Sequence, residues 1–407
     1  MAITKIAEPY DFSPAYNPLK FIYDSTNKNE LGFKYIFDVY ASGTATKIGE
    51  YRVFPVYSSG YGEIDLSKLL STKVSYDNSI TSTTSYNAAN SFYKYDVKIG
   101  EEYVVNYPYT ASLTDNAGNV KITATHAFIV GDQITIAQAD GGAANPQLEG
   151  LFTVIAVTGT TDFTIDALWS DITDATINGT ASYSDNRKTV TRDIVTELNK
   201  YVWNGALSFQ GWRLYDELRY ILNSASDLLL TDLPQTGFYA TPEQDLIVNF
   251  GNNSVTTGFA YFQNSNGDVF KKAITNADII TGVSVGPNNV GALTLVSGTA
   301  TLVKSDTTYY DFWYTNAGGT QHSVKYRVNI DTRCKIEDYE ILFLDRKGSW
   351  GSFAFQLRSY ERGSVTRTTY NKDVVGSVAS SKWFYSASEF GMTTSNVEVS
   401  TTRELNT

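Results

Sequence analysis

Residues 33–40 read FKYIFDVY, a stretch in which apolar and polar side chains alternate. A period of two places successive side chains on opposite faces of a β-strand, one face buried and the other wet. The same alternation recurs at residues 51–57, 93–99 and 323–330. Residues 259–270 add a predicted hairpin, because the Asn-Gly pair in its turn supplies the positive φ angles of a tight connection. The sequence therefore predicts an all-β protein.

Composition indicates a folded chain with many short strands. Of the 407 residues, 14% are aromatic and 18% are charged, whereas a disordered chain has few aromatic residues and many charges. Gly, Asn and Asp recur about every ten residues, which is typical of all-β sandwiches and barrels. We expect two β-sandwich domains, immunoglobulin-like or fibronectin-like, with a small inserted β-barrel module.

One segment has helical rather than strand periodicity. The apolar residues Leu214, Tyr215, Leu218, Ile221 and Leu222 recur at helical spacing between Trp212 and Asn223. This spacing predicts one amphipathic helix over 212–223, about three turns long. Such a helix either covers one end or face of a sandwich or docks onto a neighbouring subunit. A shorter helical turn is expected at residues 65–70.

The charge distribution separates a module from its surroundings. Residues 111–186 contain nine acidic residues and one basic residue, Lys121, a net charge of −8 out of −11 for the whole chain. The window also has strand candidates of its own at 133–137, 152–157 and 163–166. Like charges on one small module repel one another, so we expect an autonomous, solvated β module inserted into the first domain.

The C-terminal part has the opposite charge. Residues 346–372 contain six bases and one acid, a net charge of +5, and residues 374–407 are rich in Ser and Thr. We interpret the latter as an extended arm, or as a strand added to a partner. The expected domains are a first sandwich at 1–110 plus 187–235, the acidic module at 111–186, a second sandwich at 236–373 and the arm at 374–407.

The residue inventory argues against an enzyme. There are two histidines, His126 and His322, and one cysteine, Cys334, so a disulfide within the chain is impossible and a His/Cys metal site is disfavoured. Neither histidine lies in a catalytic motif, and no phosphate-binding or dinucleotide-binding motif occurs. We expect no catalytic residues, no cofactor and no metal.

Charge and hydropathy also limit the partners. A net charge of −11 disfavours nucleic acid, which requires a basic footprint. The N-terminal residues lack the apolar core of a signal peptide, and no run of 18 apolar residues occurs. We therefore expect assembly in a cytoplasm without membrane insertion.

The carboxylates have a structural interpretation. Glu101 and Glu102 are adjacent near a strand, where neighbouring side chains point to opposite faces, so they do not flank one glycosidic bond. Asp171 and Asp174 lie among turn residues, and for both pairs a solvated face is the expected setting. Residues 24–30 resemble a calcium loop but lack its Gly and Glu positions, which favours a turn between strands.

Two surfaces remain as binding candidates. Residues 309–314 form an aromatic strand, and its Tyr310, Phe312, Trp313 and Tyr314 are candidates for stacking on sugar rings. The alternative is that both faces of this strand are covered. The second candidate is electrostatic, because the acidic module of one copy complements the basic stretch of the next. The candidate interface residues are Arg346, Lys347, Arg358, Arg362, Arg367 and Lys372, facing Asp162, Asp166, Asp171 and Asp174.

Several segments resemble virion structural proteins of tailed bacteriophages, especially crAss-like and related phages of Bacteroidota hosts. The resemblance lies in residues 8–19 (EPYDFSPAYNPL) with 33–35 and 38–39, in 203–207 with 230–234, and in 343–350 (FLDRKGSW). The acidic insertion is similar to a small β module of phage proteins, through His126, Gly131-Asp132, Gly150, Phe152 and Phe163. These blocks are scattered over residues 1–370.

The resemblance implies a non-enzymatic virion component that contacts other virion proteins and copies of itself. By analogy we expect a tail-associated component, which is a protein of the tail itself, of the baseplate or of an adaptor. The alternatives are a capsid auxiliary or decoration protein and a carbohydrate-binding receptor-recognition protein. The sequence leaves head or tail position, symmetry and copy number open.

Overall fold

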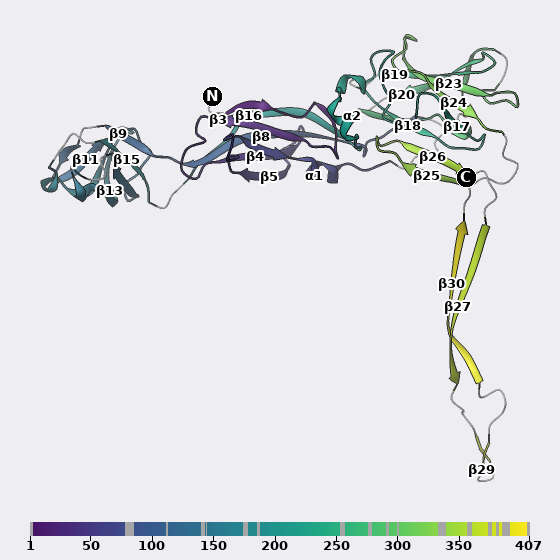
Figure 1. Cartoon of the computed structure of the whole chain (residues 1–407). Coiled ribbons are helices and arrows are strands. Elements are labelled where there is room, and N and C mark those ends of the chain that lie inside the picture. The colour runs from purple at the N-terminus through teal and green to yellow at the C-terminus, as the bar shows by residue number, and fades with distance from the viewer. Residues whose placement is uncertain are drawn as a thin grey trace. The chain divides into compact units, whose positions relative to one another are not determined.

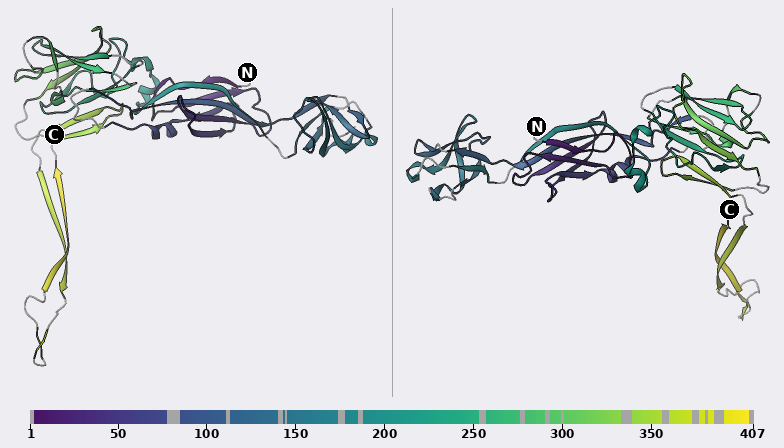
Figure 2. Two further views of the ribbon diagram at one scale, coloured as in Figure 1. Left: turned by 180° about the vertical axis from the view of Figure 1, so that it is seen from behind. Right: turned by 45° about the horizontal axis from the view of Figure 1, so that its top comes forward.

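The computed structural model describes residues 3–77, 85–110, 113–139, 143, 145–173, 178–184, 188–252, 257–275, 279–289, 293–298, 301–332, 339–355, 360–372, 377–379, 382–384 and 391–404. The described chain is mostly β-structure with little helix, which confirms the expected all-β fold class. It divides into two compact units, Met1–Asp77 with Asn90–Glu217, and Asn78–Ala89 with Leu218–Thr407. Figures 1 and 2 show the strands of these units in three views.

The first unit contains a β-sandwich. A five-stranded sheet in the order β2-β16-β8-β4-β5 faces a three-stranded sheet in the order β1-β3-β6. The strands are β1 (Ile3–Ala7), β2 (Phe12–Pro14), β3 (Lys20–Ser25), β4 (Lys34–Ala41), β5 (Lys47–Val53), β6 (Gly62–Asp65), β8 (Phe92–Val104) and β16 (Lys188–Trp203). Side chains such as Phe21 and Tyr23 of β3 and Tyr35 and Phe37 of β4 form one buried core between the sheets.

Strand β4 shows how the alternating pattern builds this core. Tyr35, Phe37 and Val39 are fully buried, as the alternation predicts. Asp38, on the opposite face, is also buried and forms ion pairs with Lys47 (2.9 Å) and Arg192. The outer face of the sheet is therefore covered by paired charges rather than left wet.

The neighbouring strand β8 corrects the expectation for Glu101 and Glu102, which point to opposite faces of the sheet, Glu101 to the inner face opposite Tyr35 and Glu102 to the outer face opposite Lys34. Both lie within β8 and are buried, at 2% and 3% exposure, instead of on a solvated face. Glu101 accepts hydrogen bonds from Ser25 Oγ and Asn27 Nδ2, both at 2.7 Å. Glu102 is surrounded by bases from neighbouring strands. These are Lys188 (3.2 Å), Arg52 (3.4 Å) and Lys34 (4.0 Å). Burial is tolerated because each carboxylate is hydrogen-bonded or paired.

The acidic module forms its own sheet and core. Its seven strands run in the order β10-β11-β14-β13-β12-β15-β9. They are β9 (Tyr107–Thr110), β10 (Leu113–Asn116), β11 (Asn119–Thr123), β12 (Gln133–Gln138), β13 (Gly150–Thr158), β14 (Asp162–Leu168) and β15 (Asn178–Tyr183). A curved sheet of this kind buries Val120, Ile134, Val154 and Phe163 on its inner side. The chain enters it from β8 and leaves it into β16.

The expected helix over 212–223 is wrong. Helix α2 covers only Phe209–Arg213, and a single 3-10 turn follows at Glu217–Arg219. Tertiary contacts replace the helical bonds, since Glu217 accepts a hydrogen bond from the Phe12 amide (2.9 Å) and the Leu222 amide donates to Gly251 O. Leu214 and Leu218 are consequently 75% and 69% exposed. The expected short turn near residue 65 is present as α1 (Ser67–Leu70) with a 3-10 turn at Ser71–Lys73.

The second unit contains another β-sandwich. A six-stranded sheet, β17-β24-β23-β19-β20-β22, packs over a five-stranded sheet, β25-β26-β18-β21-β7. The strands are β7 (Ser85–Asn87), β17 (Phe238–Ala240), β18 (Ile247–Gly251), β19 (Thr257–Asn264), β20 (Val269–Thr275), β21 (Ile280–Ser284), β22 (Thr294–Ser297), β23 (Tyr309–Asn316), β24 (Tyr326–Ile330), β25 (Tyr339–Leu344) and β26 (Trp350–Phe355). A 3-10 turn lies in this unit at Pro287–Asn289, and two others lie in the acidic module, at Pro146–Leu148 and Trp169–Asp171.

This division differs from the expected domains. Residues 218–235 belong to the second unit, and so does β7, which comes from a segment between two parts of the first unit. Strand β7 pairs with β21, where Tyr86 lies directly opposite Gly282. A Cβ atom at residue 282 would lie 2.3 Å from the Tyr86 ring, so only glycine fits under that ring.

Most strand predictions agree with the structure, and two differ at their ends. The hairpin at 259–270 is formed by β19 and β20, paired from Thr257 opposite Thr275 to Gln263 opposite Val269. Strand β5 ends at Val53, two residues before Pro55, which has no amide hydrogen to donate to a ladder. Strand β24 begins at Tyr326 because the preceding amide of Val324 donates to Asp227 O outside the sheet.

The described C-terminal residues form two small sheets. Strands β27 (Tyr360–Lys372) and β30 (Gly391–Glu404) make a long antiparallel hairpin, and β28 (Ser377–Ala379) pairs with β29 (Lys382–Phe384) between them. In both views of Figure 2, β27 and β30 run side by side. The expected arm is thus one half of a hairpin, and the other half comes from the predicted basic stretch.

Candidate interaction site

The aromatic strand 309–314 is β23, and its two faces have different environments. Tyr310, Phe312 and Tyr314 point into the core and are 0%, 2% and 5% exposed. The prediction that these three residues stack on sugar rings is therefore wrong, because all three belong to the core. Trp313 points to the other face and is half-buried.

The outer face of β23 carries aromatic rings paired with cations. Trp313 stacks on Tyr261 of β19, directly opposite, with ring centroids 5.7 Å apart and planes at 23°. The Lys325 Nζ lies 4.2 Å from the centroid of the Trp313 ring. Similarly, Arg327 lies over the Tyr309 ring and forms an ion pair with Asp311 (2.8 Å). These contacts stabilise the sheet surface around the half-buried Trp313.

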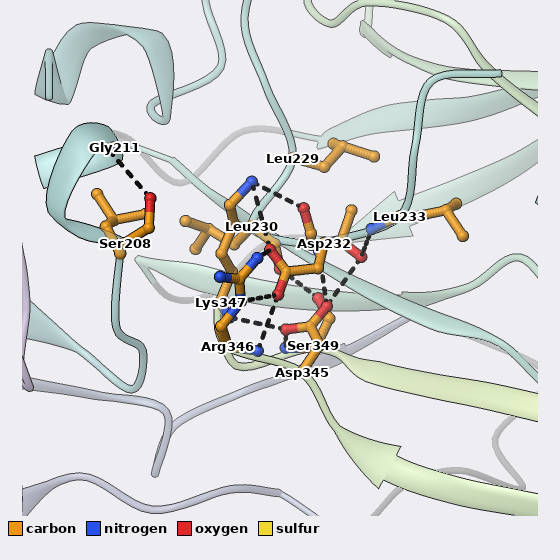
Figure 3. A network of polar contacts seen from close by, with 12 residues as sticks. Ser208, Gly211, Leu229, Leu230, Asp232, Leu233, Asp345, Arg346, Lys347 and Ser349 are labelled. Atoms are coloured by element: carbon orange, nitrogen blue, oxygen red, sulfur yellow. Dashed lines mark hydrogen bonds and ion pairs between the residues drawn. The ribbon is translucent and has the colours of Figure 1, made fainter. Parts of the chain in front are cut away.

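The predicted interface bases Arg346 and Lys347 are engaged within their own chain (Figure 3). Arg346 Nε donates to Asp232 at 2.9 Å, and Lys347 Nζ donates to Thr231 O at 3.0 Å. Burial lowers the pKa of Lys347. Lys347 is therefore largely occupied within its own chain, whereas the Arg346 side chain remains 66% exposed beside Asp232.

Asp345 organises this network. Its carboxylate accepts hydrogen bonds from the amides of Asp232, Lys347 and Ser349, each at 2.9 Å, and from Thr231 Oγ1 at 3.0 Å. Burial raises the pKa of Asp345 in spite of these bonds. The arrangement fastens the β25–β26 turn to the segment before β17, which is a structural role.

Of the other charged residues predicted for the interface, some form hydrogen bonds or ion pairs within the chain and some are exposed. On the acidic module, the pKa of Asp162 is lowered by a hydrogen bond from Thr123 and by Lys121, whose Nζ is 3.5 Å away. Asp166 accepts from the Thr153 amide (2.9 Å), and Asp171 is exposed. Arg362 forms an exposed ion pair with Glu404 (3.6 Å), and Arg367 is exposed. Asp174, Arg358 and the side chain of Lys372 lie outside what the structure describes.

Both histidines have structural settings. His126 is buried, its Nδ1 accepts from the Phe128 amide (3.0 Å), and its ring packs against Phe163. His322 Nε2 lies 3.3 Å from Asn316 Nδ2. Among the described residues there is no group of three or more His, Cys, Asp or Glu placed to hold a metal ion. The described residues also contain no helix long and apolar enough to cross a membrane.

Among the described segments, the β27–β30 hairpin is exposed along nearly its whole length. Every side chain described in residues 360–371 is exposed, and so are those in 392–404 except the partly buried Thr393. The register pairs Val365 with Val399 and Arg367 with Val397, with a bulge near Thr368. In the described residues, neither strand pairs with any strand but the other.

The two faces of this hairpin differ in polarity. One face carries an apolar row, which sequence analysis missed because polar and charged residues separate its members along the chain and because Val365 lies in the other strand. The row consists of Val365, Met392, Val397 and Val399, which are 50–72% exposed. The opposite face carries mainly Ser, Thr, Asn and charged side chains. Only the register, which joins residues more than thirty positions apart, brings the row together.

Comparisons with known proteins leave the chain without a family. No protein-family model matches it, and no curated protein does. Among solved structures it is similar to a complex of Dpr2 Ig1-Ig2 with DIP-Theta Ig1-Ig3, at 10% identity over 81% of this chain and 99% of that one, with a TM-score of 0.15. It is also similar to E. coli alpha-2-macroglobulin, at 8% identity over 84% of this chain and 24% of that one, again with a TM-score of 0.15. At such TM-scores the chain paths do not superimpose, and neither similarity identifies the protein.

Proposed function

We propose that this chain is a non-enzymatic structural subunit of a tailed-phage virion, associated with the tail, which acts through contacts with copies of itself and with other virion proteins. The observation that carries the proposal is the exposed β27–β30 hairpin. An isolated two-stranded ribbon is marginally stable in water, so a partner that covers it would account for its length. Exposed strand edges are also ready templates for pairing with another chain.

The sequence resemblance to phage virion proteins supplies the virion part of the proposal. The buried carboxylates of Glu101, Glu102 and Asp345 and the buried ring of His126 have hydrogen-bonded or ion-paired settings within the fold, which agrees with a building block. The virion would be assembled in the host cytoplasm. The capsid-decoration alternative uses the same hairpin and differs only in location.

Two measurements test the proposal. First, the purified full chain and a variant lacking residues 360–404 are compared by multi-angle light scattering and negative-stain microscopy over a concentration series. We expect defined oligomers for the full chain and smaller species for the variant, with the circular dichroism of the two sandwiches retained. Second, antibodies against the chain should label the tails of phage particles. A chain that stays monomeric and labels no particle would contradict the proposal.

Carbohydrate binding is a second candidate, favoured by the outward position of Trp313 beside Tyr261. It now rests on Trp313 and its neighbours alone. Aromatic rings at a surface can stack on the apolar faces of sugars, and Lys325 and Arg327 would attract acidic glycans.

A further inference from the structure

We propose that β27 of one copy pairs edge to edge with β30 of the next, so that the hairpins of successive copies form one continuous antiparallel sheet. The inference rests on the proposed self-assembly and names the surface and the partner, a second copy of this chain. Hairpins that point the same way satisfy this pairing, because β27 and β30 run in opposite directions within each hairpin.

The edges are long enough for pairing on either side of the bulge near Thr368. Natural sheet edges are blocked by proline, shortness, bulges or charged side chains, and of these the hairpin has one bulge and a few charges. No proline occurs after Pro287 in the sequence, and β27 and β30 are 13 and 14 residues long, with one bulge. Each outer edge carries backbone donors and acceptors at every second residue, and a neighbouring strand satisfies them.

Charge selects which edges meet. Strand β27 carries Glu361 with Arg362, Arg367 and Lys372, a net charge of +2, whereas β30 carries Arg403 with Glu398 and Glu404, a net charge of −1. Pairing β27 with a second β27 would bring two positive strands together, and pairing two β30 strands would join two negative ones. Like charges on adjacent strands are unfavourable, so the mixed pair is preferred.

The pairs inside the hairpin show how such an interface is built. Arg403 and Glu361 lie opposite each other and form an ion pair at 2.7 Å, and Val365 lies opposite Val399. A neighbour's β30 in the same register, or shifted by two residues, presents the same kinds of side chain to the other edge of β27. The valines then line up across copies on one face, because an even shift keeps each side chain on its face.

A contact between two different edges of identical chains determines which kind of assembly forms. Such head-to-tail interfaces generate closed rings when the rotation closes and filaments when it does not. The apolar row becomes a continuous belt along the joined sheet, shielded further with every copy added. The hairpin is thereby stabilised by assembly rather than by its own core.

Single-cysteine cross-linking tests the pairing, because Cys334 is the sole cysteine of the chain. In a Cys334→Ser background, Val365→Cys is co-expressed with an affinity-tagged partner carrying Val397→Cys, Val399→Cys or Thr401→Cys, which lie on the same face. Partners carrying Glu398→Cys or Ser400→Cys, on the opposite face, are the matched controls. Disulfide-linked dimers are captured by the tag under oxidising conditions.

We expect linked dimers with at least one same-face partner, few with the opposite-face controls, and few when Val365→Cys is expressed alone. Equal linkage by Val365→Cys alone would overturn the inference, since it indicates β27 paired with β27. Oligomers seen by light scattering without any linkage would also overturn it, while leaving the proposed assembly function intact. A strict monomer in every sample contradicts both.

Discussion

Lys272 lies in the core of the second sandwich and allows a quantitative prediction. On β20 the side chains of Phe270, Lys272 and Ile274 point inward and are 3%, 3% and 1% exposed. The Lys272 Nζ donates one long hydrogen bond, 3.4 Å, to Ser284 O. Burial lowers the pKa of Lys272 to about 8, against 10.5 for an ordinary lysine.

This lowered pKa makes the charged lysine destabilising. The difference of about 2.5, at about 1.4 kcal/mol per pKa unit, corresponds to about 3 kcal/mol of unfolding free energy lost at pH 7, below both pKa values. Between pH 8 and pH 10.5 the unfolded chain binds a proton that the folded chain has released, so stability rises with pH. The destabilisation disappears above the pKa of the unfolded state.

Substitution of Lys272 by Met removes the charge and keeps an unbranched side chain. Lys272→Met leaves Ser284 O without this donor, at about 1 kcal/mol, so we expect a net gain of about 2 kcal/mol at pH 7. Urea denaturation of both proteins at pH 7 and pH 10 measures the effect. Lys271→Met, on the outer face of the same strand, is the control and should change little.

The pH dependence separates this explanation from simple repacking. The wild-type protein should gain stability between pH 7 and pH 10 relative to Lys272→Met, and the difference between the two should shrink. Ionisation of tyrosines affects both proteins equally. A Met variant that is less stable at pH 7, or a difference that does not depend on pH, would refute the reasoning.

Three further expectations concern other parts of the chain. Glu102→Gln should cost the first unit about 2 kcal/mol in urea denaturation, because a buried carboxylate loses its pairs with Lys188 and Arg52. The control Glu63→Gln, at a half-buried carboxylate paired with the exposed Lys20, should change little, and equal effects would contradict the expectation. Deletion of residues 113–184 should weaken association and flatten its salt dependence in light scattering, and unchanged assembly would remove the electrostatic role of the acidic module. Trp313→Ala should abolish signals on a glycan array, and a wild-type protein without binding above background would eliminate the carbohydrate hypothesis.

Local sequence patterns predicted the strands and the hairpin correctly where residues close together in the sequence determine the structure. Alternation at 33–40 placed Tyr35, Phe37 and Val39 in a core, and the Asn-Gly turn placed the β19–β20 hairpin. Alternation in β23 likewise separated Tyr310 from Trp313. It did not say which face was buried, because that depends on the second sheet packed against it.

Predictions failed where distant residues decided the structure. The helical spacing at 212–223 competed with hydrogen bonds to Phe12 and Gly251, which the spacing does not reveal. Glu101 and Glu102 appeared solvated because their partners, such as Asn27 and Lys188, are far away in the sequence. The apolar row of the hairpin became visible only through the pairing of Val365 with Val399.

Strand β7 has a consequence for how this protein can be divided. Because residues 78–89 belong to the second unit, the chain crosses between the units three times, at residues 77–78, 89–90 and 217–218. A protease that cuts one crossing leaves two covalent tethers intact, and no single contiguous fragment contains a complete unit of either kind. Gene truncation or recombination at one junction therefore cannot exchange one unit for another.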